Sequence, residues 1–92
     1  MVDDNLPCWV YRSPRKQEMY LYLAEEDAFD KVPDQLLQSF GEPILVIGLE
    51  LSAERQLARE DVNQVMHNLR TQGYHLQMPP QLHPELYHGN PI

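Results

Sequence analysis

Cysteine, glycine and positive charge are scarce in this chain of 92 residues. It has one cysteine, four glycines, and seven Lys or Arg residues against fourteen Asp or Glu residues. The single Cys8 excludes an internal disulfide, and one thiol needs three further histidine or carboxylate ligands to complete a zinc site. We therefore expect a reducing compartment, the cytoplasm, to be the natural location.

Long apolar runs and targeting signals are also missing. The N-terminal segment MVDDNLPC lacks the basic and apolar regions of a signal peptide. The longest apolar run, ILVIGL at residues 44–49, is far shorter than the roughly 20 residues that span a bilayer. These absences predict a cytoplasmic protein that does not enter the membrane.

The net charge of -7 argues against sequence-independent binding to nucleic acid. The charge is uneven, because residues 1–23 carry three acids and three bases whereas residues 24–92 carry eleven acids and four bases. All of the excess negative charge therefore follows residue 23.

The composition is that of an ordinary globular domain, with 42% apolar and 23% charged residues. The length suits one small domain with a single core. We expect an N-terminal extension at residues 1–7, one domain at residues 8–80, and an irregular, proline-containing tail at residues 81–92.

The pattern of apolar residues predicts four strands and two helices. Two aromatic-rich runs at residues 8–12 and 19–24 predict a hairpin, and the uniform run at 44–49 predicts a central strand covered on both faces. A short helix follows Pro33, with a weaker turn before it around residues 25–31. Val62, Val65, Met66 and Leu69 have helical spacing, and Gly73 supplies the exit. Alternation in YHLQM, residues 74–78, predicts a last strand with Tyr74, Leu76 and Met78 on its buried side.

This β-β-α-β-α-β order predicts an α+β fold, a two-layer sandwich with both helices on one face of a four-stranded sheet. The connection from the strand at 44–49 through a helix to the strand at 74–78 predicts that these two strands run parallel. The predicted sheet is therefore mixed.

The hairpin stretch WVYRSPRKQEMYLY concentrates four rings and three cations, and its register decides where they lie. In a four-residue loop, Trp9 faces Tyr20, and all four rings gather on the side away from the helices. In a three-residue loop, Trp9 faces Leu21, and Trp9 and Tyr11 enter the core. We favour the four-residue loop, because Pro14 suits a type I turn and no glycine is present for the shorter one.

The segments CWVYRS, MYLYL, VPDQLLQSFGEP, LVIGLEL and QGYHLQMPP, in this order and spacing, resemble the YcgL family of small bacterial proteins. The resemblance covers about Cys8 to Pro80. It implies a compact α/β domain and supplies no catalytic motif.

The residues favour a non-catalytic protein-interaction module over an enzyme. The predicted contact surface combines the four hairpin rings with the neighbouring cations: Trp9, Tyr11, Tyr20, Tyr22, Arg12, Arg15 and Lys16. The expected partner is another protein or a second copy of the chain. The alternative is single-stranded RNA binding, in which the same rings stack on bases and the same cations neutralise phosphates.

Neither a catalytic centre nor a metal or cofactor site is expected. His67 and His75 lie on predicted polar faces, and His83 and His88 lie in the tail, without the spacing of metal ligands. Cys8 begins a strand among apolar neighbours, so we interpret it as a small buried hydrophobe.

Overall fold

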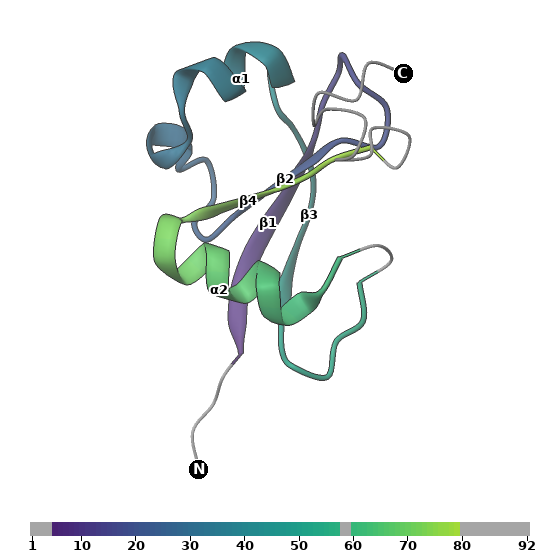
Figure 1. The fold of residues 1–92 in the computed structure, drawn as a ribbon, viewed down its shortest axis with the longest axis vertical. Coiled ribbons are helices and arrows are strands. Elements are labelled where there is room, and N and C mark those ends of the chain that lie inside the picture. The colour runs from purple at the N-terminus through teal and green to yellow at the C-terminus, as the bar shows by residue number, and fades with distance from the viewer. Residues whose placement is uncertain (1–4, 58–59, 80–92) are drawn as a thin grey trace, which may run out of the picture.

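A computed structural model describes residues 5–57 and 60–79 of the protein. Across these residues, four strands form one sheet with two helices and a single 3-10 turn (Figure 1). The strands are β1 (Leu6–Arg12), β2 (Tyr20–Leu23), β3 (Ile44–Leu51) and β4 (Tyr74–Gln77). The 3-10 turn η1 (Phe29–Lys31) precedes α1 (Asp34–Phe40), and α2 (Val62–Gln72) connects β3 to β4. The predicted α+β class and order of elements are confirmed.

The sheet has the order β3-β1-β2-β4, and each neighbouring pair is antiparallel. The prediction of a mixed sheet is therefore wrong. A right-handed parallel crossover requires strands that share a direction. Here β3 and β4 occupy opposite edges and run in opposite directions, because the β1-β2 hairpin lies between them.

The two helices pack on opposite faces of the sheet, which corrects the predicted two-layer sandwich. One core cluster joins α2 to the side of β1 that carries Cys8 and Val10. A second cluster joins η1 and α1 to the side of β1 that carries Tyr11 and Trp9. The hairpin is thus the middle layer of a helix–sheet–helix arrangement, and both of its faces carry apolar residues.

The helix α2 follows the sequence prediction closely. Its buried side chains are the four predicted from their spacing, Val62, Val65, Met66 and Leu69. The Asp61 carboxylate caps the N-terminus by accepting a hydrogen bond from the Asn63 amide at 3.0 Å. Gly73 ends the helix in the left-handed region at φ 89°. A side chain at position 73 would also meet the Lys31 side chain, because an added Cβ would lie 2.6 Å from Lys31 Cδ.

The hairpin takes neither of the two predicted registers. Trp9 pairs with Leu23 and Arg12 with Tyr20, so the connection runs from Ser13 to Met19. The Ser13 amide donates to the Met19 carbonyl at 3.0 Å and closes this longer loop. Glu18 adopts the left-handed conformation at φ 62°. We had expected glycine to be needed for this conformation in the loop.

The buried Ser13 hydroxyl holds this loop against the end of α1. It donates to the Phe40 carbonyl at 2.5 Å and accepts from the amides of Arg15 and Lys16 at 3.1 and 3.0 Å. The Arg15 guanidinium donates to the Gln38 carbonyl at 2.9 Å, which also satisfies a carbonyl in the last turn of the helix. The loop conformation therefore depends on a helix more than twenty residues away.

Candidate interaction surface

The observed register divides the four hairpin rings between the two faces of the sheet. Trp9 and Tyr11 lie on the α1 side, whereas Tyr20 and Tyr22 lie on the α2 side. The side chains of β1 lie on the sides that the favoured register predicts, but those of β2 lie on the opposite sides. A register that differs by an odd number of residues exchanges the two faces of one strand in this way. The four rings do not form one surface.

The ring of Tyr11 is buried beside Phe29, at 4.9 Å between centroids in an edge-to-face arrangement. Its hydroxyl donates to the Asp27 carboxylate at 3.0 Å and accepts from the Asp27 amide at 2.8 Å. Burial raises the pKa of this hydroxyl, although the bond from the Asp27 amide opposes part of the shift. These bonds also hold Asp27 in its left-handed conformation, at φ 62°. Tyr11 is a structural residue at this position.

Polar groups of β4 are buried beneath α2, which corrects the predicted orientation of this strand. His75 and Gln77 are buried, whereas Met78 is exposed. The Tyr22 hydroxyl donates to Gln77 Oε1 at 2.8 Å, and its ring meets His75 edge to face. Tyr74 and Leu76, predicted on the buried side of the strand, are half-buried and pack against the cluster on the α1 side. Because helices cover both faces, both sides of β4 carry buried groups.

His75 is fixed by a chain of side-chain hydrogen bonds. Gln64 Nε2 donates to Asn68 Oδ1 at 3.1 Å, so the Asn68 amide nitrogen faces His75 Nδ1 at 2.9 Å. The other ring nitrogen, Nε2, lies 2.5 Å from Glu60 Oε1. This arrangement places the ring proton on Nε2, facing the carboxylate. The sequence signal for this network was the pair of polar residues at alternate positions of β4. We interpreted these side chains as exposed to solvent.

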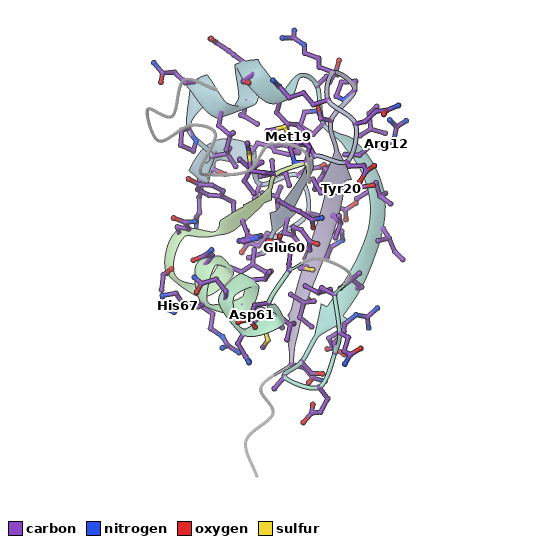
Figure 2. All side chains as sticks on the ribbon, turned by 45° about the vertical axis from the view of Figure 1, so that its right-hand side comes forward. Arg12, Met19, Tyr20, Glu60, Asp61 and His67 are labelled. Atoms are coloured by element: carbon purple, nitrogen blue, oxygen red, sulfur yellow. The ribbon has the colours of Figure 1, made fainter. Side chains whose placement is uncertain are left out.

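The hairpin cations are spread rather than gathered around the rings. Arg12 and Tyr20 are paired across β1 and β2 and lie together near the loop (Figure 2). Arg15 is engaged with the Gln38 carbonyl, and Lys16 is exposed in the loop. Arg12, Arg15 and Tyr20 line an open hollow of about 540 Å³ together with loop residues. The Glu18 carboxylate shares that hollow, so its charge is mixed.

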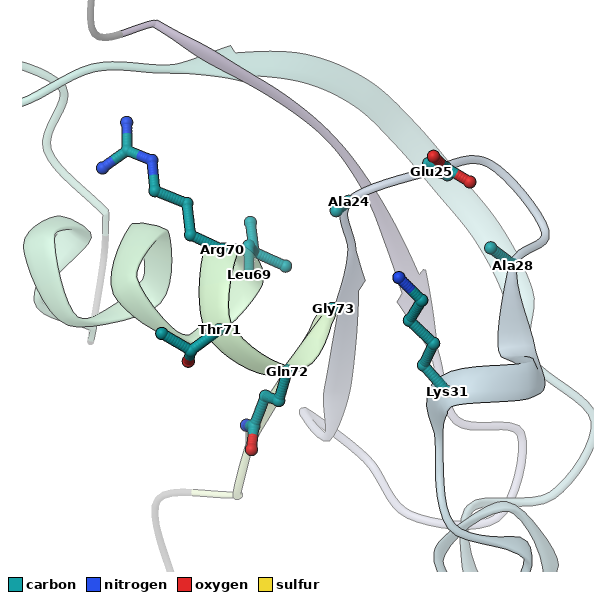
Figure 3. Close-up of a pocket in the computed structure, with 9 residues that line it drawn as sticks. All are labelled: Ala24, Glu25, Ala28, Lys31, Leu69, Arg70, Thr71, Gln72 and Gly73. Carbon is teal, nitrogen blue, oxygen red and sulfur yellow. The ribbon is translucent and has the colours of Figure 1, made fainter.

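A separate pocket of about 330 Å³ lies where the chain after β2 meets the end of α2 (Figure 3). Lys31 and Arg70 enter it from different elements, and Glu25 adds a carboxylate. The Ala24 amide donates to the Gly73 carbonyl at 3.2 Å along one wall. The cations suit the negative end of α2. We interpret this pocket as a packing seam between loop and helix.

Neither the thiol nor the described histidines form a reactive cluster. Cys8 is fully buried, and burial raises the pKa of its thiol to about 11, with Arg55 lowering it only in part. This confirms the prediction of a small buried hydrophobe. His67 is exposed, and His83 and His88 lie outside the described residues. Residues 5–57 and 60–79 contain no group of three or more His, Cys, Asp or Glu side chains arranged to hold a metal ion.

Among the described residues, the largest apolar exposure lies on β3, where the sequence predicted a covered central strand. Ile44, Leu45, Val46 and Ile47 are 37%, 46%, 50% and 49% exposed. In the sheet that the described residues form, β3 is an edge strand with β1 as its one neighbour. The second half of the strand is different, because Leu49 packs against the α2 core and Leu51 is fully buried. We call residues Ile44–Ile47 the edge patch.

A β-bulge shapes the edge patch. Val10 pairs with Ile47 and Tyr11 with Leu45, so Val46 is the extra residue on β3. By these pairings Ile44 and Ile47 lie on the α2 side of the sheet and Leu45 lies on the α1 side. Neither helix ribbon covers this end of the strand (Figure 1). Periodicity missed the patch because a uniformly apolar run is also the pattern of a doubly covered strand.

Within the part of the chain that is described, neither helix has the length and apolar character needed to cross a bilayer. The fold and surface define a small α+β domain: an antiparallel four-stranded sheet with helices on both faces and an exposed aliphatic edge. A family model for the YcgL domain matches residues 8–80, and the chain belongs to this family.

Curated relatives agree with this assignment. A YcgL domain-containing protein of Stutzerimonas stutzeri is 57% identical over 76 residues, which are 83% of this chain and 78% of the relative. Relatives with the same description from Pseudomonas fluorescens and Azotobacter vinelandii are each 56% identical over 73 residues, 79% of this chain and 75% of theirs. The resemblance found in the sequence is thereby confirmed.

Proposed function

We propose that this protein is a non-catalytic protein-interaction module that receives an extended segment of a partner along the edge patch. The observation that carries the proposal is four consecutive half-exposed aliphatic side chains on an edge strand. Folded proteins ordinarily protect such edges with charge, proline, a β-bulge or a covering element, and this uncharged stretch has the bulge at Val46 but no covering element among the described residues. An apolar edge of this kind is typical of an interaction site.

The chemistry of the patch specifies the partner segment. The unpaired backbone groups of an edge strand offer main-chain hydrogen bonds to an added strand. Side chains on both sides of β3 add apolar contacts, and Ile44–Leu49 carries no charge. The matching segment is therefore extended, uncharged and rich in aliphatic residues. This surface replaces the four-ring surface expected from the sequence, since those rings are divided between two faces.

The test uses the wild-type chain and two variants as affinity baits in lysate of the source bacterium. Bound proteins are identified by mass spectrometry, and the affinity of each purified partner for the three baits is then measured. Ile47→Lys places a charge in the patch, and Met78→Lys is the matched control, because Met78 is also exposed but follows β4. We expect the control to retain the partner and Ile47→Lys to lose it, at least about tenfold in affinity, with similar thermal unfolding. Equal binding of a purified partner by all three proteins would reject the proposal.

Single-stranded RNA binding has narrower support. Arg12 and Tyr20 are adjacent on the α2 side, which is the arrangement of one stacked base beside one phosphate. The second ring pair lies on the other face, and the chain carries a net charge of -7. Titration of short single-stranded oligonucleotides at two salt concentrations tests this function, because phosphate contacts weaken as salt rises. Absence of binding at low salt would reject RNA binding as a function.

A further inference from the structure

The edge patch is too small to hold a second copy of the chain by itself. A stable protein interface buries about 800 Å² on each partner. Four half-exposed aliphatic side chains provide only a fraction of that area. Two copies also repel one another, because each carries a net charge of -7. A covering segment from the same molecule avoids both difficulties, since its local concentration reaches the millimolar range without a large interface.

The chain that follows β4 starts at the correct end of the sheet for this role. The strand pairings place Gln77, Tyr20, Arg12 and Ile44 in one row across the four strands. Strands lie about 4.8 Å apart, so β3 is three spacings, roughly 14 Å, from Gln77, and a segment lying along its free edge is four spacings, roughly 19 Å, away. Leu86 follows Gln77 by nine residues. An extended chain of that length spans up to about 30 Å, which leaves slack for a turn around the hairpin loop.

The segment also has suitable chemistry. Residues 80–92 contain Leu82, Leu86, Tyr87 and Ile92 as apolar groups, with Glu85 as the one acidic side chain and no Lys or Arg. Proline at positions 80, 84 and 91 favours an extended chain. Apolar side chains in a nearly uncharged extended segment match the partner chemistry derived for the edge patch.

We propose that the segment Leu82–Tyr87 packs on the edge patch of its own molecule, so that a partner must displace this segment in order to bind. This inference rests on the proposed function, because it assigns a built-in competitor to the same surface. The segment then sets the apparent affinity of the module: the intramolecular contact protects the aliphatic edge until a segment with better complementarity arrives.

The test uses full-length protein labelled at its Ile, Leu and Val methyl groups and observed by NMR. A Leu86→Asp, Tyr87→Asp double variant removes the apolar contacts, and Gln81→Asp is the control that adds negative charge to the tail without removing them. We expect the methyl signals of Ile44, Val46 and Ile47 to shift in the double variant and to remain in place in the control. The wild-type signals should be unchanged by twentyfold dilution.

Two results would overturn the inference. One is identical edge-patch signals in wild type and double variant, which would show that the tail does not touch β3. The other is wild-type signals that move on dilution toward those of the double variant, which would identify a second copy as the occupant.

Partner capture separates this inference from the proposed function. With both correct, the double variant captures the partner of the module several-fold better than wild type. If the tail contact is absent but Ile47→Lys still loses the partner, the inference fails and the function stands. If the contact is present and Ile47→Lys captures as wild type does, the function fails instead.

Discussion

The indole of Trp9 lies directly over Gly48, its cross-strand partner on β3. A Cβ placed at position 48 would be 3.0 Å from the indole Nε1 and 3.1 Å from Cδ1. The ring thereby covers a stretch of strand that has no side chain of its own, a way in which aromatic residues stabilise glycine within sheets. This contact anchors the edge strand to β1 near the edge patch.

Substitution Gly48→Val is expected to displace the indole, because the new side chain requires the space that the ring occupies. We expect a loss of about 1–3 kcal/mol in the free energy of unfolding. Trp9 is the single tryptophan, so its fluorescence reports the displacement directly, as a shift of emission to longer wavelength. Glu50→Val is the control, since it adds the same side chain at an exposed position of β3. Unchanged emission in Gly48→Val would contradict the contact.

Substitution Ser13→Ala is expected to destabilise the protein by about 1–3 kcal/mol, because it removes three hydrogen bonds at a buried position. The Phe40 carbonyl and the amides of Arg15 and Lys16 would lose their partner. Ser39→Ala is the matched control, because Ser39 is exposed on α1. Urea denaturation measures both variants. Equal stability of Ser13→Ala and wild type would show that the loop does not depend on this hydroxyl.

The buried thiol of Cys8 predicts a loss of stability at alkaline pH. Its pKa is about 11 in the folded protein and 9.0 for the ordinary thiol. The unfolded chain therefore releases this proton first, and its contribution to stability, full below pH 9, falls as pH rises toward 11. The loss reaches about 2–3 kcal/mol, at 1.36 kcal/mol for each pKa unit.

The measurement for Cys8 is urea denaturation of wild type and Cys8→Ala between pH 8 and pH 11. Tyr11 also has a raised pKa, so both proteins lose stability through its ionisation at high pH. The difference between the two proteins isolates the thiol. A difference that stays constant over this range would be inconsistent with a buried, neutral Cys8.

Substitution Val65→Asp is expected to unfold the domain. Val65 is fully buried between α2 and the sheet, and an unpaired carboxylate there costs several kcal/mol against a total stability of roughly 5–15 kcal/mol. His67→Asp on the exposed side of the same helix is the control. Circular dichroism should show loss of structure in the first variant and its retention in the second. A folded Val65→Asp protein would contradict the assigned core.

The elements predicted correctly are those in which local sequence carries the whole signal. The helix α2 has apolar residues at helical spacing, an acidic cap and a terminal glycine within one short stretch. The helix α1 also follows Pro33 and ends at Phe40, with Gly41 directly after it as expected. Cys8 was also interpreted correctly, because its immediate neighbours along the strand are apolar.

The errors arose where distant residues decide the structure. The hairpin register depends on the bond from Ser13 to the Phe40 carbonyl, and local turn preferences do not contain that contact. The burial of His75 depends in the same way on Glu60, which precedes α2. For β3, the apolar run of the sequence fits a covered strand and an exposed edge equally well. Only the order of strands in the sheet distinguishes these two environments.

The extra residue at Val46 has a consequence for the behaviour of the protein in concentrated solution. A bulge raises the local twist of its strand, and a twisted edge cannot be extended by copy after copy into a flat ribbon. Mutual repulsion between molecules supplements this barrier at neutral pH, but it disappears near the isoelectric point of about 4.8. Colloidal stability should therefore be lowest around that acidity, and removal of one residue from the bulge should convert a well-behaved solution into one prone to fibrillar aggregation.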